Sequence, residues 1–315
     1  MTDGNRRAIA AALVANAGIA LAKFAAFLVT GASSMLAEAV HSLADTGNQG
    51  LLFLGAARAR RSPDAEHPFG YGRERYFWSF IVALVLFSLG SVFAISEGVA
   101  KLRHPHTLES PGWAIAVLLM AIVLESWSLR TAVREANRVR GKKGWWDFVR
   151  HSKTPELPVV LLEDLGALSG LAFALIGLSL TIAFDDARYD SMATIAIGGL
   201  LGVIAAVLAS EMKSLLIGEG ASPSHVAAIR RAIHTASPVR RLIHLRTLHL
   251  GPDQLLVAAK VEFDSDLGFA EVAATINDVE ARVRESVPIA VMIYLEPDVH
   301  IREPRSPVEV PSPPS

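Results

Sequence analysis

Cysteine is absent from the 315 residues of the chain. The chain therefore forms no disulfide and offers no thiolate, so any metal ion must be held by carboxylate and imidazole groups. A large charge of either sign is absent too, because 30 lysines and arginines stand against 31 aspartates and glutamates. A near-neutral chain lacks the basic excess that is typical of nucleic-acid binding, so we expect no nucleic-acid partner.

Charged residues are scarce as well, at 19% of the chain against 51% hydrophobic residues. Six apolar segments have about the 20-residue length that crosses a bilayer core. They are approximately residues 8–30, 33–57, 76–99, 113–133, 158–182 and 191–216. We therefore expect residues 1–217 to form a bundle of six transmembrane helices in a lipid bilayer.

Lysine and arginine gather in alternate connections between these segments. Arg6 and Arg7 precede the first segment, five arginines lie within residues 58–75, and residues 134–153 are basic. The other connections are short or acidic apart from Lys101 and Arg103. Because cytoplasmic loops are rich in these residues, we expect both termini to be cytoplasmic in a multi-pass protein of the inner cell membrane.

From about Gly218 the pattern changes to that of a soluble domain. It predicts a helix after a Ser222 cap, two strands around the turn GPDQ, a second amphipathic helix and a final strand. This order of helix, strand, strand, helix and strand predicts a small α+β domain at residues 218–301. Residues 302–315 are rich in proline, which is typical of a disordered tail.

The second segment carries a polar stripe that a membrane helix rarely has. Glu38, His41, Asp45 and Asn48 follow one another at intervals of three or four residues, which places them on one helical face. An ionisable side chain in the middle of a spanning helix costs on the order of 3 kcal/mol, so a compensating role is expected. His41 and Asp45 are spaced to offer a nitrogen and an oxygen to one ion, or to form a hydrogen bond that only orients helices.

The fifth segment adds two carboxylates, Glu163 and Asp164, near Gly166 and Gly170, whose small size lets another helix approach. If the second and fifth segments pack together, His41, Asp45 and Asp164 can converge on one ion. Neighbouring residues point about 100° apart on a helix, so Glu163 and Asp164 do not both aim at one centre. One of them can be a ligand while the other carries a proton or pairs with a basic group.

These motifs resemble those of the cation diffusion facilitator family, in the branch that includes the zinc transporter nine-like proteins. The resemblance rests on SSMLAEAVHSLADTGNQ in the second segment, HPFGYGRERYFW after it and LLED in the fifth. It covers nearly the whole chain apart from the tail. It implies six spans, a cytoplasmic C-terminal dimerisation domain, and a homodimer that exchanges zinc or a related divalent ion for protons.

The resemblance also implies the ligands. The family uses a tetrahedral site with two ligands from the second span and two from the fifth, onto which His41, Asp45 and Asp164 map. Val160 stands where most relatives have histidine or aspartate, so the fourth position falls to Glu163, to water or to Glu38. We therefore predict a metal site of His41, Asp45, Asp164 and Glu163.

Two further family sites look altered. The loop after the second span keeps Asp64 and His67 but has Tyr71 where a second histidine often stands, so an ion bound there would be held weakly. In the C-terminal domain, family zinc positions hold Ile243, Lys260, Tyr294 and Glu296. His225, His234, His244 and His249 show no ligand spacing, so we interpret them as solvated surface residues and the domain as a dimerisation scaffold.

Other polar residues of the spans have weaker assignments. Lys23, Glu97 and Glu125 either line the pathway or pair between helices. Asn16 is a further pathway candidate, and Asn48 and Gln49 are expected to support the ligands. The resemblance implies that Arg73 joins the membrane part to the last span, with Glu211 or Glu219 as its partner.

The function predicted from these residues is export of a divalent cation from the cytoplasm in exchange for protons, by a transporter and not an enzyme, with no cofactor. Zinc is the expected ion, because a mixed imidazole and carboxylate tetrahedral site suits it. Manganese is an alternative that Val160 favours. A membrane metallohydrolase would need a general base, for which Glu163 is a candidate, but the sequence has no HExxH motif. A metal-responsive scaffold that does not transport is the third alternative.

Overall fold

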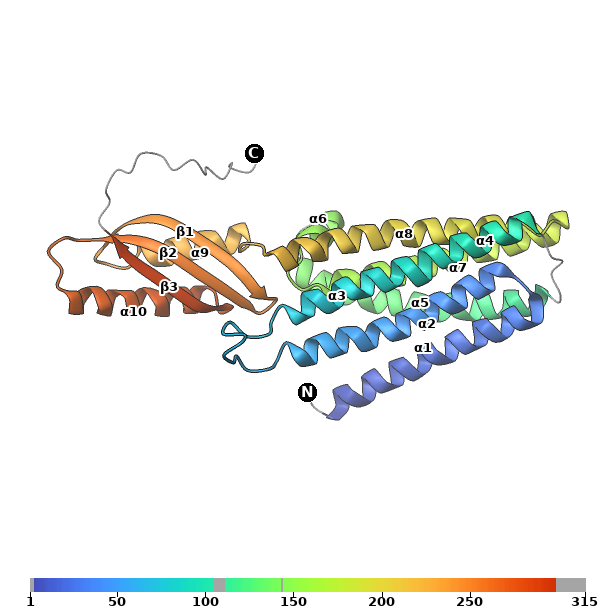
Figure 1. The fold of residues 1–315 in the computed structure, drawn as a ribbon, viewed down its shortest axis with the longest axis horizontal. Helices are drawn as coiled ribbons and strands as arrows, with labels where there is room; N and C mark the ends of the chain where they lie inside the picture. The colour runs from blue at the N-terminus through green and yellow to red at the C-terminus, as the bar shows by residue number, and fades with distance from the viewer. Residues whose placement is uncertain (1–2, 105–110, 143, 299–315) are drawn as a thin grey trace. The chain divides into compact units, whose positions relative to one another are not determined.

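The computed structural model describes residues 3–104, 111–142 and 144–298. The chain divides into two compact units, residues 1–217 and 218–315. The described part of the first unit is helical, and the second unit combines helices with a sheet (Figure 1). The tail expected at residues 302–315 lies outside the described residues.

The first unit is built from helices, of which the long ones run side by side (Figure 1). They are α1 (Asp3–Thr30), α2 (Ser33–Arg58), α3 (Glu74–Val85), the π-helical turn η1 (Leu86–Val92), α4 (Phe93–Arg103), α5 (Pro111–Arg140), α6 (Trp145–His151), α7 (Glu156–Phe184) and α8 (Arg188–Ile217). Because α3, η1 and α4 follow one another directly, Glu74–Arg103 forms one span of 30 residues.

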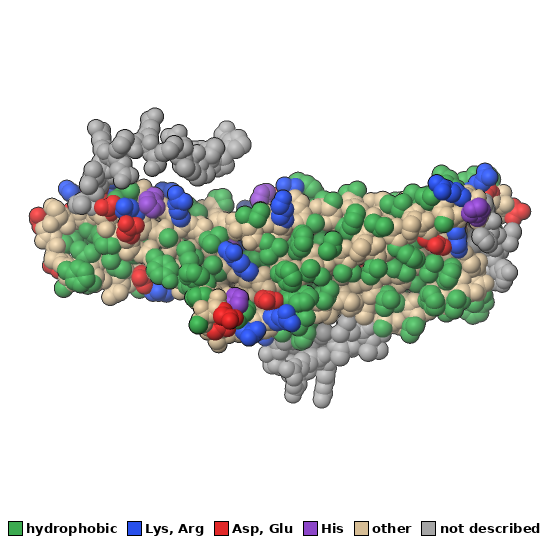
Figure 2. All heavy atoms as spheres, viewed as in Figure 1, with side chains coloured by type: hydrophobic (Ala, Val, Ile, Leu, Met, Phe, Trp, Pro, Cys, Tyr) green, Lys and Arg blue, Asp and Glu red, His purple; other side chains and the backbone are tan. Residues whose placement is uncertain are grey.

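α2 occupies the centre of the bundle and contacts α1, α3, α7 and α8. Leucine and isoleucine side chains of η1, α7 and α8, such as Leu86, Leu171 and Ile197, are fully buried around it. Hydrophobic side chains also cover the outside of the helical unit, while lysine and arginine lie toward its ends (Figure 2). Apolar residues that face outward, such as Trp127 at 74% exposure, are those expected to contact lipid.

Four helices of the described chain are long and apolar enough to cross a membrane, namely Glu74–Arg103, Gly112–Arg140, Glu156–Phe184 and Arg188–Ile217. In α1, the part whose side chains the structure describes includes the shorter apolar stretch Ala17–Thr30, which is not one of these four. α2 is not among these helices, because its polar stripe of Glu38, His41, Asp45 and Asn48 lowers its hydropathy. The protein is thus a helical membrane protein, while the number of six spans stays a prediction.

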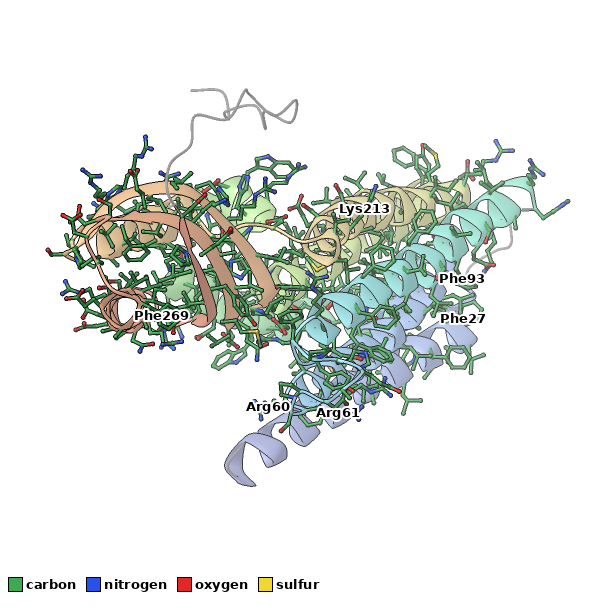
Figure 3. All side chains as sticks on the ribbon, turned by 60° about the vertical axis from the view of Figure 1, so that its left-hand side comes forward. Phe27, Arg60, Arg61, Phe93, Lys213 and Phe269 are labelled. Atoms are coloured by element: carbon green, nitrogen blue, oxygen red, sulfur yellow. The ribbon has the colours of Figure 1, made fainter. Side chains whose placement is uncertain are left out.

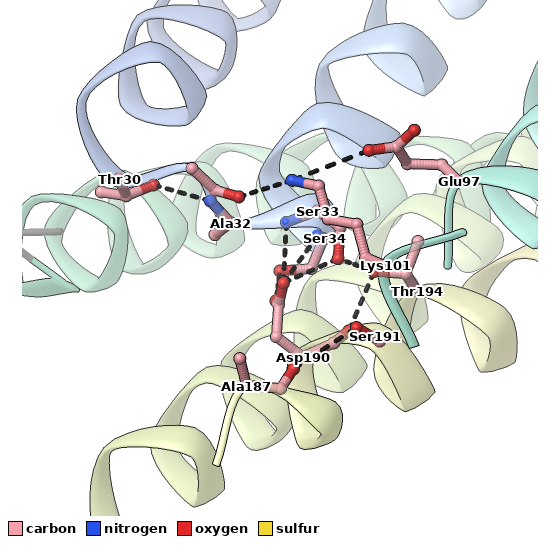
Figure 4. A network of polar contacts seen from close by, with 11 residues as sticks. Thr30, Ala32, Ser33, Ser34, Glu97, Lys101, Ala187, Asp190, Ser191 and Thr194 are labelled. Carbon is pink, nitrogen blue, oxygen red and sulfur yellow. Dashed lines mark hydrogen bonds and ion pairs between the residues drawn. The ribbon is translucent and has the colours of Figure 1, made fainter. Parts of the chain in front are cut away.

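The connection between α1 and α2 is held at one end of the bundle by polar contacts (Figure 4). Lys101 Nζ of α4 donates to the carbonyl oxygen of Gly31 at 2.6 Å. Asp190 of α8 accepts hydrogen bonds from the backbone N–H and the hydroxyl of Ser33, both at 2.7 Å, and from the hydroxyl of Ser34. α2 has no side-chain cap of its own, so Asp190 supplies the carboxylate that its first turn favours.

The second unit has the predicted order of elements. α9 (Pro223–His234) begins after Ser222, whose hydroxyl accepts from the His225 N–H at 3.3 Å. β1 (Val239–Gly251) and β2 (Gln254–Phe263) form an antiparallel hairpin, and β3 (Ala290–Asp298) pairs in parallel with β2 after α10 (Phe269–Ser286). Alternate residues of β2, such as Leu255, Val257 and Val261, are buried against both helices.

Two elements of the first unit differ from the sequence-based expectation. The basic stretch between the fourth and fifth segments contains the short helix α6, in which Phe148 and Val149 are buried. The third span contains the π-helical turn η1, where Gly90 and Ser91 are buried. α6 is too short to show a periodic apolar pattern, and η1 lies inside a continuous apolar run that does not reveal a wider turn.

Candidate metal-transport site

α2 and α7 lie side by side and antiparallel, and two contacts fix their register. Asn48 Nδ2 of α2 donates to Glu163 Oε1 of α7 at 2.7 Å. Nearer the other end of the stripe, Glu38 lies so close to Gly170 that a Cβ atom there would overlap Glu38 Oε1. The glycine thus leaves room for the close approach of this carboxylate. This register brings Asp45 level with Glu163 and Asp164.

A pocket of about 20 Å³ lies beside these residues, which is room for a single water-sized group. Asp45, Glu163 and Asp164 all line it, and Glu125 and Ser128 of α5 line its other side. The remaining lining residues are Ile19, Ser42, Gln49 and Val160. Three of the four predicted site residues thus share one small cavity.

His41, the fourth predicted residue, is fully buried but is not among the described residues that line this pocket. Its Nδ1 atom lies 3.5 Å from Asp45 Oδ1, a residue that does line it. Both ring nitrogens of His41 lack a hydrogen-bond partner among the described residues, and so does Oδ1 of Asp45. Buried polar atoms are normally paired, so these atoms hold unused ligand capacity.

Glu163 and Asp164 reach toward different helices, as their 100° separation predicts. Glu163 accepts from Asn48 of α2, whereas Asp164 Oδ2 accepts from Ser128 Oγ of α5 at 2.9 Å. Asn48 therefore supports a predicted ligand, as expected. Ser128 was not predicted, and Glu125, three residues before it, was a candidate without an assigned role.

As arranged here, no three histidine, aspartate or glutamate side chains of the described chain converge closely enough to hold a metal ion. The apolar Val160 faces the pocket beside Gln49. Glu38, one of the options for the fourth ligand, is engaged by Lys23 Nζ at 3.0 Å. The ligand set therefore stays a prediction, with Asp45, Glu163 and Asp164 together and His41 next to Asp45.

The loop after α2 uses its acidic residue internally. Asp64 accepts a hydrogen bond from the Tyr71 hydroxyl at 2.5 Å and from the backbone N–H of His67 at 2.8 Å. These bonds, led by that of Tyr71, lower the pKa of Asp64, and the same bond raises the pKa of Tyr71. Arg60 and Arg61, near the end of α2, precede this loop (Figure 3). The hydrogen bond from Tyr71 thus competes with a metal ion for the Asp64 carboxylate.

In the second unit, Lys260 pairs with Asp298 at 2.6 Å and with Glu296 at 3.4 Å. The hydrogen bond to Asp298 raises the pKa of Lys260, so a fixed positive charge stands at this family zinc position. Of the four histidines, His234 and His244 are exposed. The interpretation of His249 as solvated is wrong, because it is 1% exposed and its Nδ1 lies 3.3 Å from the Gly251 carbonyl oxygen.

Glu211, a suggested partner of Arg73, forms an ion pair with Arg150 of α6 at 2.8 Å. Arg75, two residues after Arg73, pairs with Glu156 at the start of α7. The sequence contains several arginines that could pair with Glu211 or Glu156, and spacing alone does not show which of them do.

Comparison with known proteins identifies similarity over both units. A family model described as the cation efflux transmembrane domain matches residues 9–217, and one described as the cation efflux protein, cytoplasmic domain, matches residues 221–298. The chain is 35% identical over 244 residues to the mitochondrial proton-coupled zinc antiporter of Homo sapiens. That match covers 77% of this chain and 43% of the relative, so the chain spans less than half of the relative's length.

Two further relatives are more distant in sequence. Metal tolerance protein C4 of Arabidopsis thaliana is 30% identical over 265 residues, which are 84% of this chain and 58% of the plant protein. The cation-efflux pump FieF of Pectobacterium atrosepticum is 25% identical over 303 residues, which are 92% of this chain and 93% of the pump. The names of the human and bacterial relatives, an antiporter and an efflux pump, describe transport proteins and not enzymes.

Proposed function

Because the chain belongs to the cation efflux family, also called cation diffusion facilitators, we propose that it exports zinc from the cytoplasm in exchange for protons. The observation that carries the proposal is the set of buried, unpartnered atoms of His41 and Asp45 next to a pocket that Glu163 and Asp164 also line. The name of the human relative, a proton-coupled zinc antiporter, supports zinc and protons as the exchanged ions.

In the proposed site His41, Asp45 and Asp164 bind the ion directly. Glu163 completes the coordination or carries a proton, since it lines the same pocket but is turned toward Asn48. A small rotation of the His41 side chain toward Asp45 is required, because its ring nitrogens lie beside the pocket and do not line it. No hydrogen bond of the ring nitrogens to a described residue has to be broken for this movement.

Exchange follows from competition at this site. Imidazole and carboxylate bind a metal ion only when deprotonated. An arriving ion therefore displaces protons, and a returning proton weakens the binding of the ion. If the helices that carry the site rock against the rest of the bundle, the metal-loaded and proton-loaded forms open to either side. An inward proton gradient then drives export.

The same proposal includes six spans, cytoplasmic termini, a homodimer and the inner cell membrane. The contacts of Gly31 with Lys101 and of Ser33 with Asp190 support the span number, because they hold the α1–α2 connection beside the ends of α4 and α8. The match of residues 221–298 to the family's cytoplasmic domain supports the orientation. The human relative is named as mitochondrial, so the inner cell membrane stays a prediction, and loop charge supports only the orientation.

The proposal is tested in proteoliposomes that contain the purified chain and a pH-sensitive dye. Zinc applied to the wild type should drive proton movement, and His41→Ala combined with Asp45→Ala should abolish it. The chain supplies a matched control, since His151 and Asp147 of α6 form another histidine–aspartate pair four residues apart, exposed and 2.8 Å apart. The double variant His151→Ala, Asp147→Ala should retain proton movement.

Unchanged proton movement after loss of His41 and Asp45 would falsify the proposed site. Flux that stops after about one ion per chain would instead identify a metal-responsive scaffold. Manganese is the second candidate ion, because the apolar Val160 lines the pocket where an additional nitrogen ligand would favour zinc. Competition between the two ions for uptake distinguishes these candidates.

A further inference from the structure

Lys23 of α1 is the only lysine or arginine of the described chain that is buried, with an exposure of 0%. Its ammonium lies 3.0 Å from Glu38 Oε2 and 2.7 Å from Ser42 Oγ, both on α2. Two charges removed from water require close partners, and each is strongly unfavourable without the other. The pair therefore joins α1 to α2 inside the membrane bundle, one turn from His41.

Glu38 stands on the same face of α2 as the proposed ligands. His41 follows it by three residues and Asp45 by seven, which is two helical turns. Its second oxygen, Oε1, is buried without a hydrogen-bond partner among the described residues and faces the glycine at position 170. Glu38 also interacts electrostatically with Asp45. Glu38 is thus the second carboxylate of α2, two turns from Asp45 on the face that carries the proposed ligands.

The charge of Lys23 also acts on His41, Asp45 and Glu125. A fixed cation at this position has two effects on a neighbouring metal site. It occupies Glu38, and it repels an ion that moves toward that carboxylate. Both effects would keep a transported ion at the level of Asp45, Glu163 and Asp164.

We propose that Lys23 is a selectivity-determining residue that withholds Glu38 from the transported ion. The proposal rests on the transport function argued above. With Glu38 withheld, the site keeps few ligands and an essential imidazole, a set that suits zinc. If Glu38 were released, the site would gain an oxygen ligand and a negative charge. Oxygen-rich sites with more ligands suit manganese, so the preference would move toward that ion.

The test compares initial rates of zinc and manganese uptake by proteoliposomes that contain the full chain. Lys23→Met keeps the length of the side chain and removes its charge. The ratio of manganese to zinc uptake should rise by about tenfold, the scale of effects produced by residues that support metal ligands. Lys23→Met combined with Glu38→Gln should return the ratio to that of the wild type, because the released carboxylate is gone. A residue that only joined helices would change the rates without this reversal.

Lys213→Met is the matched control, because Lys213 is exposed on α8 and undergoes the same chemical change (Figure 3). Glu38→Gln alone covers the case in which Lys23→Met does not fold, because the amide oxygen of glutamine can still accept a hydrogen bond from Lys23 Nζ. Since Glu38 does not touch the ion in the wild type, this variant should keep the wild-type ratio, and a changed ratio would overturn the proposal. An unchanged ratio in folded Lys23→Met would overturn it as well. Absence of uptake by the wild type would instead refute transport itself.

Discussion

Val160 limits the ligand capacity of the pocket at the residue scale. It lines the cavity one turn before Asp164, so a carboxylate in its place would point toward the same space. We predict that Val160→Asp tightens zinc binding by about tenfold through an added charged ligand. Without zinc the variant should melt at a lower temperature than the wild type, because another carboxylate would crowd Asp45 and Asp164.

Melting temperatures of the purified chain, measured with increasing zinc, check this prediction because an ion that binds the folded state raises them. Val160→Asn is the control, since it has nearly the same shape without the charge. Zinc-induced stabilisation that is equal in the aspartate and asparagine variants would show that position 160 does not reach the ion.

Tyr71 and Asp64 offer a second residue-scale prediction outside the membrane. The hydrogen bond from the phenol to the carboxylate is the main cause of the raised pKa of Tyr71. A raised pKa means that the protonated phenol persists to higher pH than its ordinary value of about 10. Asp64→Asn removes the charged acceptor, so phenolate should form at lower pH than in the wild type.

Ultraviolet absorbance of phenolate during an alkaline titration measures this shift. The chain has only 4 tyrosines, and Tyr71→Phe identifies the contribution of Tyr71. Equal titration curves for the wild type and Asp64→Asn would contradict the bond. If the bond holds Asp64 away from metal ions, Tyr71→Phe should also increase zinc binding at this loop.

Some residues of the site can be predicted from the sequence and others cannot, and the reasons are physical. Asp45, Glu163 and Asp164 stand out in the sequence because a carboxylate in an apolar helix is costly without a function. Ser128 does not stand out, since a hydroxyl in a helix can bond to its own backbone at little cost. The displacement of His41 from the pocket depends on the register of α2 against α7, which is fixed by Asn48 and cannot be derived from spacing along one helix.

Close packing between α7 and α8 is the main prediction at the element scale. A Cβ atom at Gly177 would overlap the Cβ of Ala193 and lie 3.0 Å from the carbonyl oxygen of Tyr189. Gly177→Ala should therefore destabilise the bundle by about 1–3 kcal/mol, the usual cost of overpacking. The melting temperature in detergent should fall accordingly.

Gly199→Ala is the matched control on α8, because a Cβ atom there would meet nothing within 4 Å. It should leave the melting temperature unchanged or raise it, since alanine favours helix by about 0.5–1 kcal/mol over glycine. If both variants melt alike, the separation of α7 and α8 is larger than described.

Elements could be predicted from the sequence where one apolar pattern ran for many residues. The α+β order of the second unit was predicted because its strands alternate and its helices are amphipathic. α6 was missed because its 7 residues carry only two buried apolar side chains, Phe148 and Val149. The π-helical turn η1 was missed because a wider turn inside a continuous apolar run does not change the hydropathy pattern.

The number of spans is the property of the whole molecule that hydropathy alone does not decide. α2 buries its polar side chains inside the bundle, so its low hydropathy does not place it outside the membrane. The contacts at Gly31 and Ser33 place the α1–α2 connection with the ends of α4 and α8. Because those two helices belong to apolar spans, α1 and α2 are expected to cross with them.

Single cysteines can test this topology without any background substitution, because the chain has none of its own. Gly31→Cys, His104→Cys and Arg188→Cys should react with a membrane-impermeant maleimide from outside the cytoplasm. Ser62→Cys and Lys142→Cys should react only from the cytoplasmic side. The positive φ of 69° at Gly31 makes the first variant about 1–2 kcal/mol less stable, which a folded bundle tolerates. Labelling of Gly31→Cys from the same side as Ser62→Cys would show that α1 and α2 do not cross, and the six-span arrangement would be wrong.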